Sequence, residues 1–283
     1  MFEQSLDLRP SPIAGTWYPA DPLTLAAEVD HYLQTAAAHL PPLEGEVVGV
    51  VAPHAGIRYS GPVAGYAFAA VQGSAPDVVA VLSPMHHPYP DPLLTTAHVA
   101  YATPLGAVPV DHEALHAFSE ALYARLGFAP TPVVNDPEHA LEIELPFLQR
   151  ALAAPFRLLP LMLRDYRAET CQAIGETLAE VLADRAALLV ASTDLSHYYP
   201  APVARRLDQT MLQRIAALDP EGVLLADQEG VGFACGAGPV AAVLWAARAW
   251  GARQGVVLHY ATSGDVTGDH SAVVGYGAVA ILR

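Results

Sequence analysis

Lysine is absent from the sequence, and all 14 of its basic residues are arginine. The chain can therefore use neither a Schiff-base lysine nor the lysine of a P-loop, and we expect no nucleotide cofactor. The 29 acidic residues outnumber the basic ones and give a formal net charge of −15 at pH 7. Because nucleic-acid binding depends on basic residues that contact phosphates, this balance disfavours a nucleic-acid partner.

Charged residues are also scarce, at 15% of the chain, whereas hydrophobic residues make up 53%. This composition predicts a single domain spanning residues 1–283 around one sizeable core. The longest apolar runs, such as residues 186–191 and 239–247, are too short to cross a bilayer. The first residues lack the basic and apolar regions of a signal peptide, so we expect a cytoplasmic protein with no membrane partner. Two cysteines cannot form a disulfide framework.

Apolar segments alternate with helical patterns along most of the chain. Continuous apolar strands between helices predict an α/β fold, with a largely parallel central sheet covered by helices on both faces. The expected strands are residues 47–52, 77–82, 156–163, 187–191, 256–261 and 272–281. The expected helices are residues 23–38, 61–71, 114–126, 138–152, 168–182, 203–218 and 239–250.

Several of these strands end in an unusual polar loop. His54 follows the first strand, His86-His87 the second, Asp194 the fourth and Asp265 the fifth. In open α/β sheets, ligands bind beyond the carboxyl ends of the strands. We therefore expect these side chains to converge on one cleft. A lone loop histidine is usually structural, but two strand-end histidines favour a functional site, with His86 rather than His87 facing the cleft.

Cys235 lies in a glycine-rich turn just before an expected helix. The positive end of that helix favours a thiolate, which is both a nucleophile and a soft metal ligand. The alternative is an inert buried cysteine, which is the better interpretation of Cys171 inside its helix.

Asp194 and His197 lie three residues apart in one loop. Both side chains can reach one site, where a histidine suits proton transfer or support of a metal ligand. The alternative for Asp194 is a helix N-cap. In the expected helix 138–152, His139 and Glu142 lie one turn apart on one face and can border the cleft, whereas Glu138 is expected to be structural.

Several blocks of the sequence together resemble the Memo family, which in prokaryotes is called AmmeMemoRadiSam system protein B. The blocks occur in the family's order and cover nearly the whole chain. They are residues 14–19 (AGTWYP), 52–56 (APHAG), 59–61 (YSG), 83–87 (SPMHH), 136–142 (DPEHALE), 145–147 (LPF), 192–197 (STDLSH), 235–236 (CG), 263–265 (SGD) and 274–276 (VGY).

The resemblance implies a fold related to class III extradiol dioxygenases and a pocket that binds iron(II) or copper through His54, His86 and Cys235. Those dioxygenases use two histidines and a glutamate, and the family has cysteine in place of the glutamate. A thiolate is a softer ligand, which favours copper or a different iron chemistry over ring cleavage. His197 matches the outer acid/base histidine of the dioxygenases. The family name also implies an AMMECR1-like protein and a radical SAM enzyme as partners.

The sequence departs from the family pattern at several places without removing a proposed ligand. Ser83 replaces a glycine, Ile57-Arg58 replaces the more usual tyrosine followed by a variable residue, and Pro137 and Ala140 lie within the fifth family block. Arg58 is a cation near the expected cleft, where it could receive an anionic substrate or pair with a carboxylate.

Three functions remain open from the sequence. The first is a metal-dependent oxidoreductase in which Asp194 and His197 orient ligands and move protons. The second is a hydrolase with Cys235 as nucleophile and His54 or His86 as its base. The third is a non-catalytic adaptor that binds metal, a peptide or a small molecule, as members of the family in animals are described.

Overall fold

A nine-stranded sheet dominates the computed structural model, which describes residues 7–283. Its centre consists of β2 (Val47–Ala52), β9 (Ala187–Ser192), β3 (Val78–Pro84) and β8 (Arg157–Leu163), which pair in parallel in that order. Nearly all residues of these strands are buried, because helices cover both faces. This burial explains why the strands are continuous apolar runs rather than alternating ones.

Antiparallel strands extend the sheet on both sides of this centre. On one side, β12 (Val273–Leu282) runs antiparallel to β2 and also pairs with β11 (Gln254–Thr262) and β10 (His197–Tyr199). On the other side, β4 (Leu93–Thr96) runs antiparallel to β8 and carries β7 (Thr131–Val133). The predicted α/β class with a covered sheet is confirmed, and the sheet is parallel at its centre and mixed overall.

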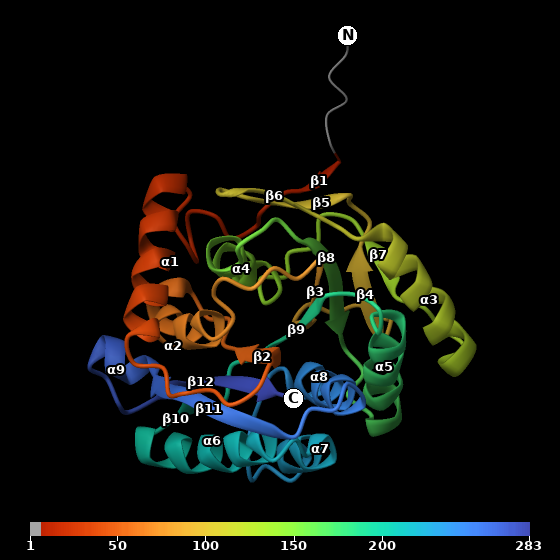
Figure 1. The fold of residues 1–283 in the computed structure, drawn as a ribbon. Helices are drawn as coiled ribbons and strands as arrows, with labels where there is room; N and C mark the ends of the chain where they lie inside the picture. The colour runs from red at the N-terminus through yellow and green to blue at the C-terminus, as the bar shows by residue number, and fades with distance from the viewer. Residues whose placement is uncertain (1–6) are drawn as a thin grey trace.

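Helices from different parts of the chain cover the two faces (Figure 1). Packed on one face are α1 (Pro22–Ala37), α2 (Ile57–Ala69) and α4 (Leu145–Ala151). The other face carries α3 (His112–Leu126), α5 (Ala168–Val181), α6 (Ala201–Ala216), α7 (Pro220–Gln228) and α8 (Ala237–Ala249). Among these described helices, none has the length and apolar character needed to cross a membrane.

Helix α8 occupies the middle of its face, between the central strands and α5. It contacts β2, β3, β8 and β9, and most of its residues are buried. Gly175 of α5 permits a close crossing of the two helices, because a Cβ atom there would lie 2.4 Å from the carbonyl oxygen of Ala242. The chain before α8 is thereby held against the carboxyl ends of the central strands.

A small second sheet, not predicted from the sequence, lies near the N-terminal part of the chain (Figure 1). It consists of β1 (Leu8–Arg9), β5 (Ala100–Thr103) and β6 (Gly106–Pro109). These strands have two to four residues each, too few for a recognisable period. The remaining short elements are the 3-10 helix η1 (Glu142–Glu144) and α9 (Ser263–Thr267).

The predicted helix 138–152 is wrong in its first turn. Regular helix begins only with η1 and α4, and residues 137–141 form an irregular turn. The carboxylate of Glu138 accepts hydrogen bonds from the backbone N–H groups of His139 and Ala140, an alternative to helical pairing. His139 and Glu142 therefore do not share a helical face. By contrast, α1 begins regularly with Asp21 as its N-cap, because the side chain of Asp21 accepts the N–H of Thr24.

Candidate metal centre

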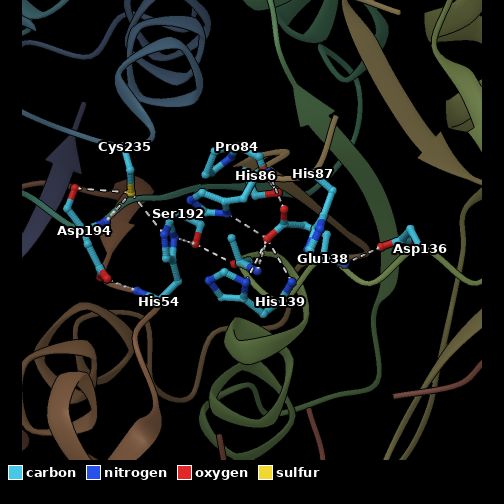
Figure 2. A network of polar contacts seen from close by, with 12 residues as sticks. His54, Pro84, His86, His87, Asp136, Glu138, His139, Ser192, Asp194 and Cys235 are labelled. Carbon is cyan, nitrogen blue, oxygen red and sulfur yellow. Dashed lines mark hydrogen bonds and ion pairs between the residues drawn. The ribbon is translucent and has the colours of Figure 1, made fainter. Parts of the chain in front are cut away.

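Three strand ends and one helix start bring the predicted residues together. His54 directly follows β2, His86 follows β3 and Asp194 follows β9, all at the carboxyl edge of the parallel strands. Cys235 precedes α8, which packs on the face of the sheet opposite α2, and it lies beside these residues (Figure 2). The structure thus brings together three residues that follow parallel strands and one that precedes a helix.

A cluster of three histidines forms one side of the site. The rings of His54 and His86 have centroids 5.3 Å apart, and those of His86 and His139 are stacked at 4.8 Å. One ligand atom from each of His54, His86 and His139 lies within 4.8 Å of the other two. His139 was predicted to border the pocket rather than to supply a ligand, and its ring reaches the other two because its loop is not helical.

Each of these histidines uses its Nδ1 atom for a contact outside the cluster. In His54, Nδ1 lies 2.9 Å from the hydroxyl of Ser192, while Nδ1 of His86 lies 3.0 Å and Nδ1 of His139 lies 3.2 Å from Glu138 Oε1. A carboxylate acceptor requires the Nδ1–H tautomer, which leaves a lone pair on Nε2. This is the arrangement by which proteins orient a metal-binding imidazole.

Burial favours the neutral forms of two of the clustered imidazoles, His54 and His139. Burial and the neighbouring His139 and His86 lower the pKa of His54 well below its usual value. Burial likewise lowers the pKa of His139 to about 4, although the nearby Glu138 opposes this shift. Burial alone would raise the pKa of Glu138, but its hydrogen bond to His86 and its electrostatic interactions with His86 and His139 lower it to about 2. At neutral pH, His54 and His139 are therefore neutral nitrogen donors, and Glu138 is an anionic supporting carboxylate.

The thiol of Cys235 contacts the histidine cluster through His54. Its Sγ atom lies 3.1 Å from His54 Nε2 and accepts the backbone N–H of Asp194 at 3.2 Å. A transition-metal ion held by both residues would lie about 2.1 Å from the nitrogen and about 2.3 Å from the sulfur, which requires the two ligand atoms to be within about 3–4 Å of each other. Cys235 and His54 therefore fit a shared transition-metal ion, and Figure 2 shows the sulfur directed toward His54.

We expected the positive end of α8 to stabilise a thiolate at Cys235, but burial has the larger effect on the pKa of this thiol. Burial and the nearby Asp194 raise the pKa of this thiol far above its ordinary value, so the metal-free protein holds it protonated. A metal ion displaces the proton of a ligating thiol, which makes metal binding at this site proton-coupled.

Asp194 links the loops of the site. Its carboxylate accepts the backbone N–H groups of His54 at 2.8 Å and Ala55 at 3.3 Å. Burial raises the pKa of Asp194 to about 7 despite these hydrogen bonds. Ring nitrogen Nδ1 of His197 lies 2.8 Å from the carbonyl oxygen of Leu195, and burial lowers the pKa of His197. Asp194 can therefore exchange protons near neutral pH, whereas burial favours the neutral form of His197.

The histidines line a cavity of about 470 Å³ that opens to solvent. Aromatic side chains border it: Trp17 stacks on His139 with centroids 4.0 Å apart, and the partly exposed Tyr59 and Tyr198 also line it. Sequence reasoning did not single out these three residues. Trp17 and Tyr59 belong to blocks of the family resemblance, and that membership was the available signal.

Three residues predicted to support the site lie elsewhere. The carboxylate of Glu142 bonds Arg9, Ser11 and Tyr18 instead of the pocket histidines. Arg58 is exposed, with its guanidinium 5.9 Å from the ring centroid of Tyr59. Asp265 is exposed and completes the capping box of α9 with Thr262. None of the three lines the histidine cavity.

Glu138, expected to be structural, is instead the residue that supports the cluster. It is buried and bonds the backbone and ring of His86 and the backbone of His139. Ser192 has a similar role for His54, and is itself held by the carbonyl oxygen of Ala140 at 2.6 Å. These contacts join residues 52 and 138 positions apart in the chain, so local sequence patterns do not reveal them.

Fold and site together define an α/β protein with a histidine- and cysteine-lined pocket, compatible with metal binding, at the carboxyl edge of its parallel strands. The sequence profile described as "Memo-like protein" matches residues 9–280. The chain therefore belongs to the Memo-like family.

Curated relatives match this chain over almost their whole length. A MEMO1 family protein of Methanopyrus kandleri is 36% identical over 281 residues, covering 96% of this chain and 98% of the relative. One from Nitrosopumilus maritimus is 32% identical and covers 97% and 100%, respectively. One from Aquifex aeolicus is 32% identical and covers 95% and 97%. The match thus includes every residue of the site.

Proposed function

We propose that this protein binds iron(II) or copper through His54, His86 and Cys235, with His139 as a further donor beside them. The observation that carries the proposal is a cluster of three imidazoles, each with a ligand nitrogen within 4.8 Å of the other two, next to a thiol 3.1 Å from Nε2 of His54. In His54 and His86 the Nδ1 atom is already engaged by a hydrogen bond. Two or three imidazoles with one sulfur ligand suit a soft or borderline transition metal better than magnesium or calcium.

The redox activity of iron or copper makes a dioxygenase-like oxidoreductase the favoured activity, by analogy with the class III extradiol dioxygenases. A bound ion of either metal would supply one-electron chemistry. His197 and Asp194 would hold and move protons at the pocket wall, and Trp17 would shield the His139 side of the cluster from water. The substrate would be a small molecule or a peptide, and an AMMECR1-like protein and a radical SAM enzyme would act in the same system.

The test is metal content by elemental analysis after anaerobic purification, for the wild type and for His54→Ala, His86→Ala and Cys235→Ala. We expect near-stoichiometric iron or copper in the wild type and a large loss in each variant. A wild type that stays metal-free after loading with Fe(II), Cu(I) and Zn(II) would contradict the proposal. Circular dichroism of the variants separates loss of the site from loss of the fold.

A non-catalytic adaptor is the second candidate, favoured by the aromatic rim of the cavity. Trp17, Tyr59 and Tyr198 are 36%, 38% and 76% exposed, and exposed aromatic side chains are common in binding surfaces. Partner binding that depends on these residues, with no O₂ consumption by the metal-loaded protein, would favour this function. The hydrolase is less well supported, because burial favours the neutral forms of both Cys235 and His54.

A further inference from the structure

A second cavity reaches Cys235 from the side away from the histidine cluster. It has a volume of about 350 Å³, and Cys235 lines it together with Tyr166, Tyr199 and Phe233. His197 lines both this cavity and the histidine cavity, so its ring forms part of the wall between them. The proposed metal centre uses the Cys235 thiol but gives this second space no role.

The walls of the second cavity combine aromatic rings with one carboxylate. Tyr199 and Phe233 are stacked, with centroids 5.7 Å apart and planes inclined by 25°. The hydroxyl of Tyr166 donates to the carbonyl oxygen of Cys235 at 2.7 Å, which fixes that ring beside the thiol. Aromatic faces attract organic cations through their quadrupole, and the attraction strengthens when water is excluded.

Asp227 supplies the carboxylate at the end of α7. Its Oδ1 atom accepts the backbone N–H of Ala234 at 3.2 Å, and no arginine or histidine within residues 7–283 forms an ion pair with it. Asp227 is half-buried, and burial raises its pKa. An ammonium group in the cavity would provide the positive charge that the surrounding residues do not. The net charge of −15 would also attract such a ligand from solution.

We infer that this second cavity binds the ammonium group of a small amine, between Asp227 and the aromatic rings of Tyr166, Tyr199 and Phe233, with the rest of the ligand directed to Cys235. The inference goes beyond the proposed metal function and applies equally to the metal-free protein. The proposed ligand is a cationic amine, which the imidazoles of the histidine cavity give no reason to expect.

Thiol labelling provides the test, because Cys235 lines the proposed site. Chelator-treated protein is reacted with 2-(trimethylammonio)ethyl methanethiosulfonate or with its anionic 2-sulfonatoethyl analogue. In both cases the sulfur of Cys235 forms a disulfide with the reagent, and methanesulfinate leaves. Mass spectrometry follows the rate of labelling at Cys235. The buried Cys171 is the internal reference, because it should stay unlabelled while the protein is folded. The ratio of the two rates measures the preference for a cation.

We expect wild type to prefer the cationic reagent and Asp227→Asn to lower that preference by about tenfold, since the removed charge lies at the site. Asparagine keeps the oxygen that accepts the Ala234 N–H, so the loop is retained. Glu229→Gln is the matched control, because Glu229 is exposed just beyond α7 and does not line the cavity. An equal fall of the ratio in both variants, or no fall in Asp227→Asn, would overturn the inference.

A protection experiment needs no variant. n-Butylammonium should slow labelling of wild-type Cys235 several-fold relative to sodium at equal ionic strength, whereas n-butanol should not. A capped lysine amide tests whether the amine belongs to a peptide side chain. Protection by the lysine amide but not by n-butylammonium would identify a lysine side chain, rather than a free amine, as the ligand. Failure of both ammonium compounds to protect Cys235 would also overturn the inference.

Discussion

The buried carboxylate of Glu138 accepts two hydrogen bonds from His86, one from the backbone N–H at 2.5 Å and one from ring Nδ1 at 3.0 Å. One side chain therefore fixes both the position and the orientation of a candidate ligand. The same carboxylate contacts the backbone and the ring of His139. Glu138 thus contacts two of the three clustered histidines and sets the tautomer of His86.

The substitution Glu138→Gln should weaken metal binding by about 10- to 100-fold, the usual effect of losing such an outer contact. Glutamine has similar size but carries no charge, and one of its two terminal groups cannot accept the N–H bonds of His86. Competition with a chromogenic chelator measures the affinity. Glu120→Gln, on the exposed side of α3, should leave it unchanged. An unchanged affinity in Glu138→Gln would remove Glu138 from the centre.

The position of Cys235 depends on the small residue that follows it. A Cβ atom on Gly236 would lie 2.4 Å from the carbonyl oxygen of Ser192 and 2.8 Å from the Cβ atom of Thr193. Gly236→Ala should therefore push the loop from β9, cost about 1–3 kcal/mol of unfolding free energy and reduce metal retention. Urea denaturation and elemental analysis measure the two effects.

Gly56→Ala is the matched control for that variant. The nearest atom to a Cβ at this position lies 3.6 Å away, although Gly56 also borders the histidine cavity. We expect the stability of this variant to stay within about 0.5 kcal/mol of wild type. Equal losses in the two glycine variants would show that the close approach at Gly236 is not the cause.

The contribution of His139 to the stability of the metal-free protein should decrease as the pH falls from about 6.5 to about 4. Burial lowers the pKa of His139 to about 4, so over this range the unfolded chain takes up a proton on this residue that the folded chain does not. The contribution of this residue to the unfolding free energy therefore falls by roughly 3 kcal/mol and levels off below pH 4, whereas Asp194, whose pKa burial raises to about 7, acts in the opposite direction. His139→Gln should reduce the pH dependence by about that amount in urea titrations of chelator-treated protein.

The exposed His116 provides the comparison, since its side chain is 74% exposed. His116→Gln should leave the pH profile of stability as it is in wild type. A His139→Gln profile that follows wild type throughout would mean that His139 is not held neutral by burial.

The sequence was sufficient to place residues that follow strands. His54, His86 and Asp194 each follow an apolar run, and parallel strands bring their carboxyl ends to one edge. Cys235 could be added because a glycine-rich turn before a helix is recognisable. These inferences needed only the order of elements and the periodicity of the segments between them.

The residues that support the ligands could not be placed in this way. From the sequence, Glu138 was interpreted as an ordinary acidic residue in the first turn of a helix. In the structure it bonds His86, and residues 137–141 are not helical. The incorrect prediction of a helical first turn at residue 138 also led to the incorrect assignment of Glu142 to the pocket. Trp17 reaches His139 across more than a hundred residues of sequence, a contact that no local period encodes. Side-chain pairing between distant loops is decided by three-dimensional packing.

Arg9 joins the N-terminal strand to the loop that carries Glu138 and His139. Its side chain is 1% exposed and donates to both carboxylate oxygens of Asp136 at 2.8 Å. It also donates to the carbonyl oxygen of Glu138 at 2.6 Å and to the carboxylate of Glu142. A single buried guanidinium therefore forms ion pairs with two buried carboxylates and anchors the loop that carries Glu138 and His139.

Replacing Arg9 with methionine should cost about 3–5 kcal/mol of unfolding free energy, because methionine keeps much of the bulk but leaves Asp136 and Glu142 buried without a cation. Urea denaturation of chelator-treated protein measures this loss free of any contribution from bound metal. Arg167→Met should cost less than about 1 kcal/mol, because that side chain is 72% exposed in its ion pair with Asp165. If Arg9→Met were as mild as Arg167→Met, the buried ion pairs would not hold this loop, and the alignment of Glu138 with His86 would depend on β3 and η1 alone.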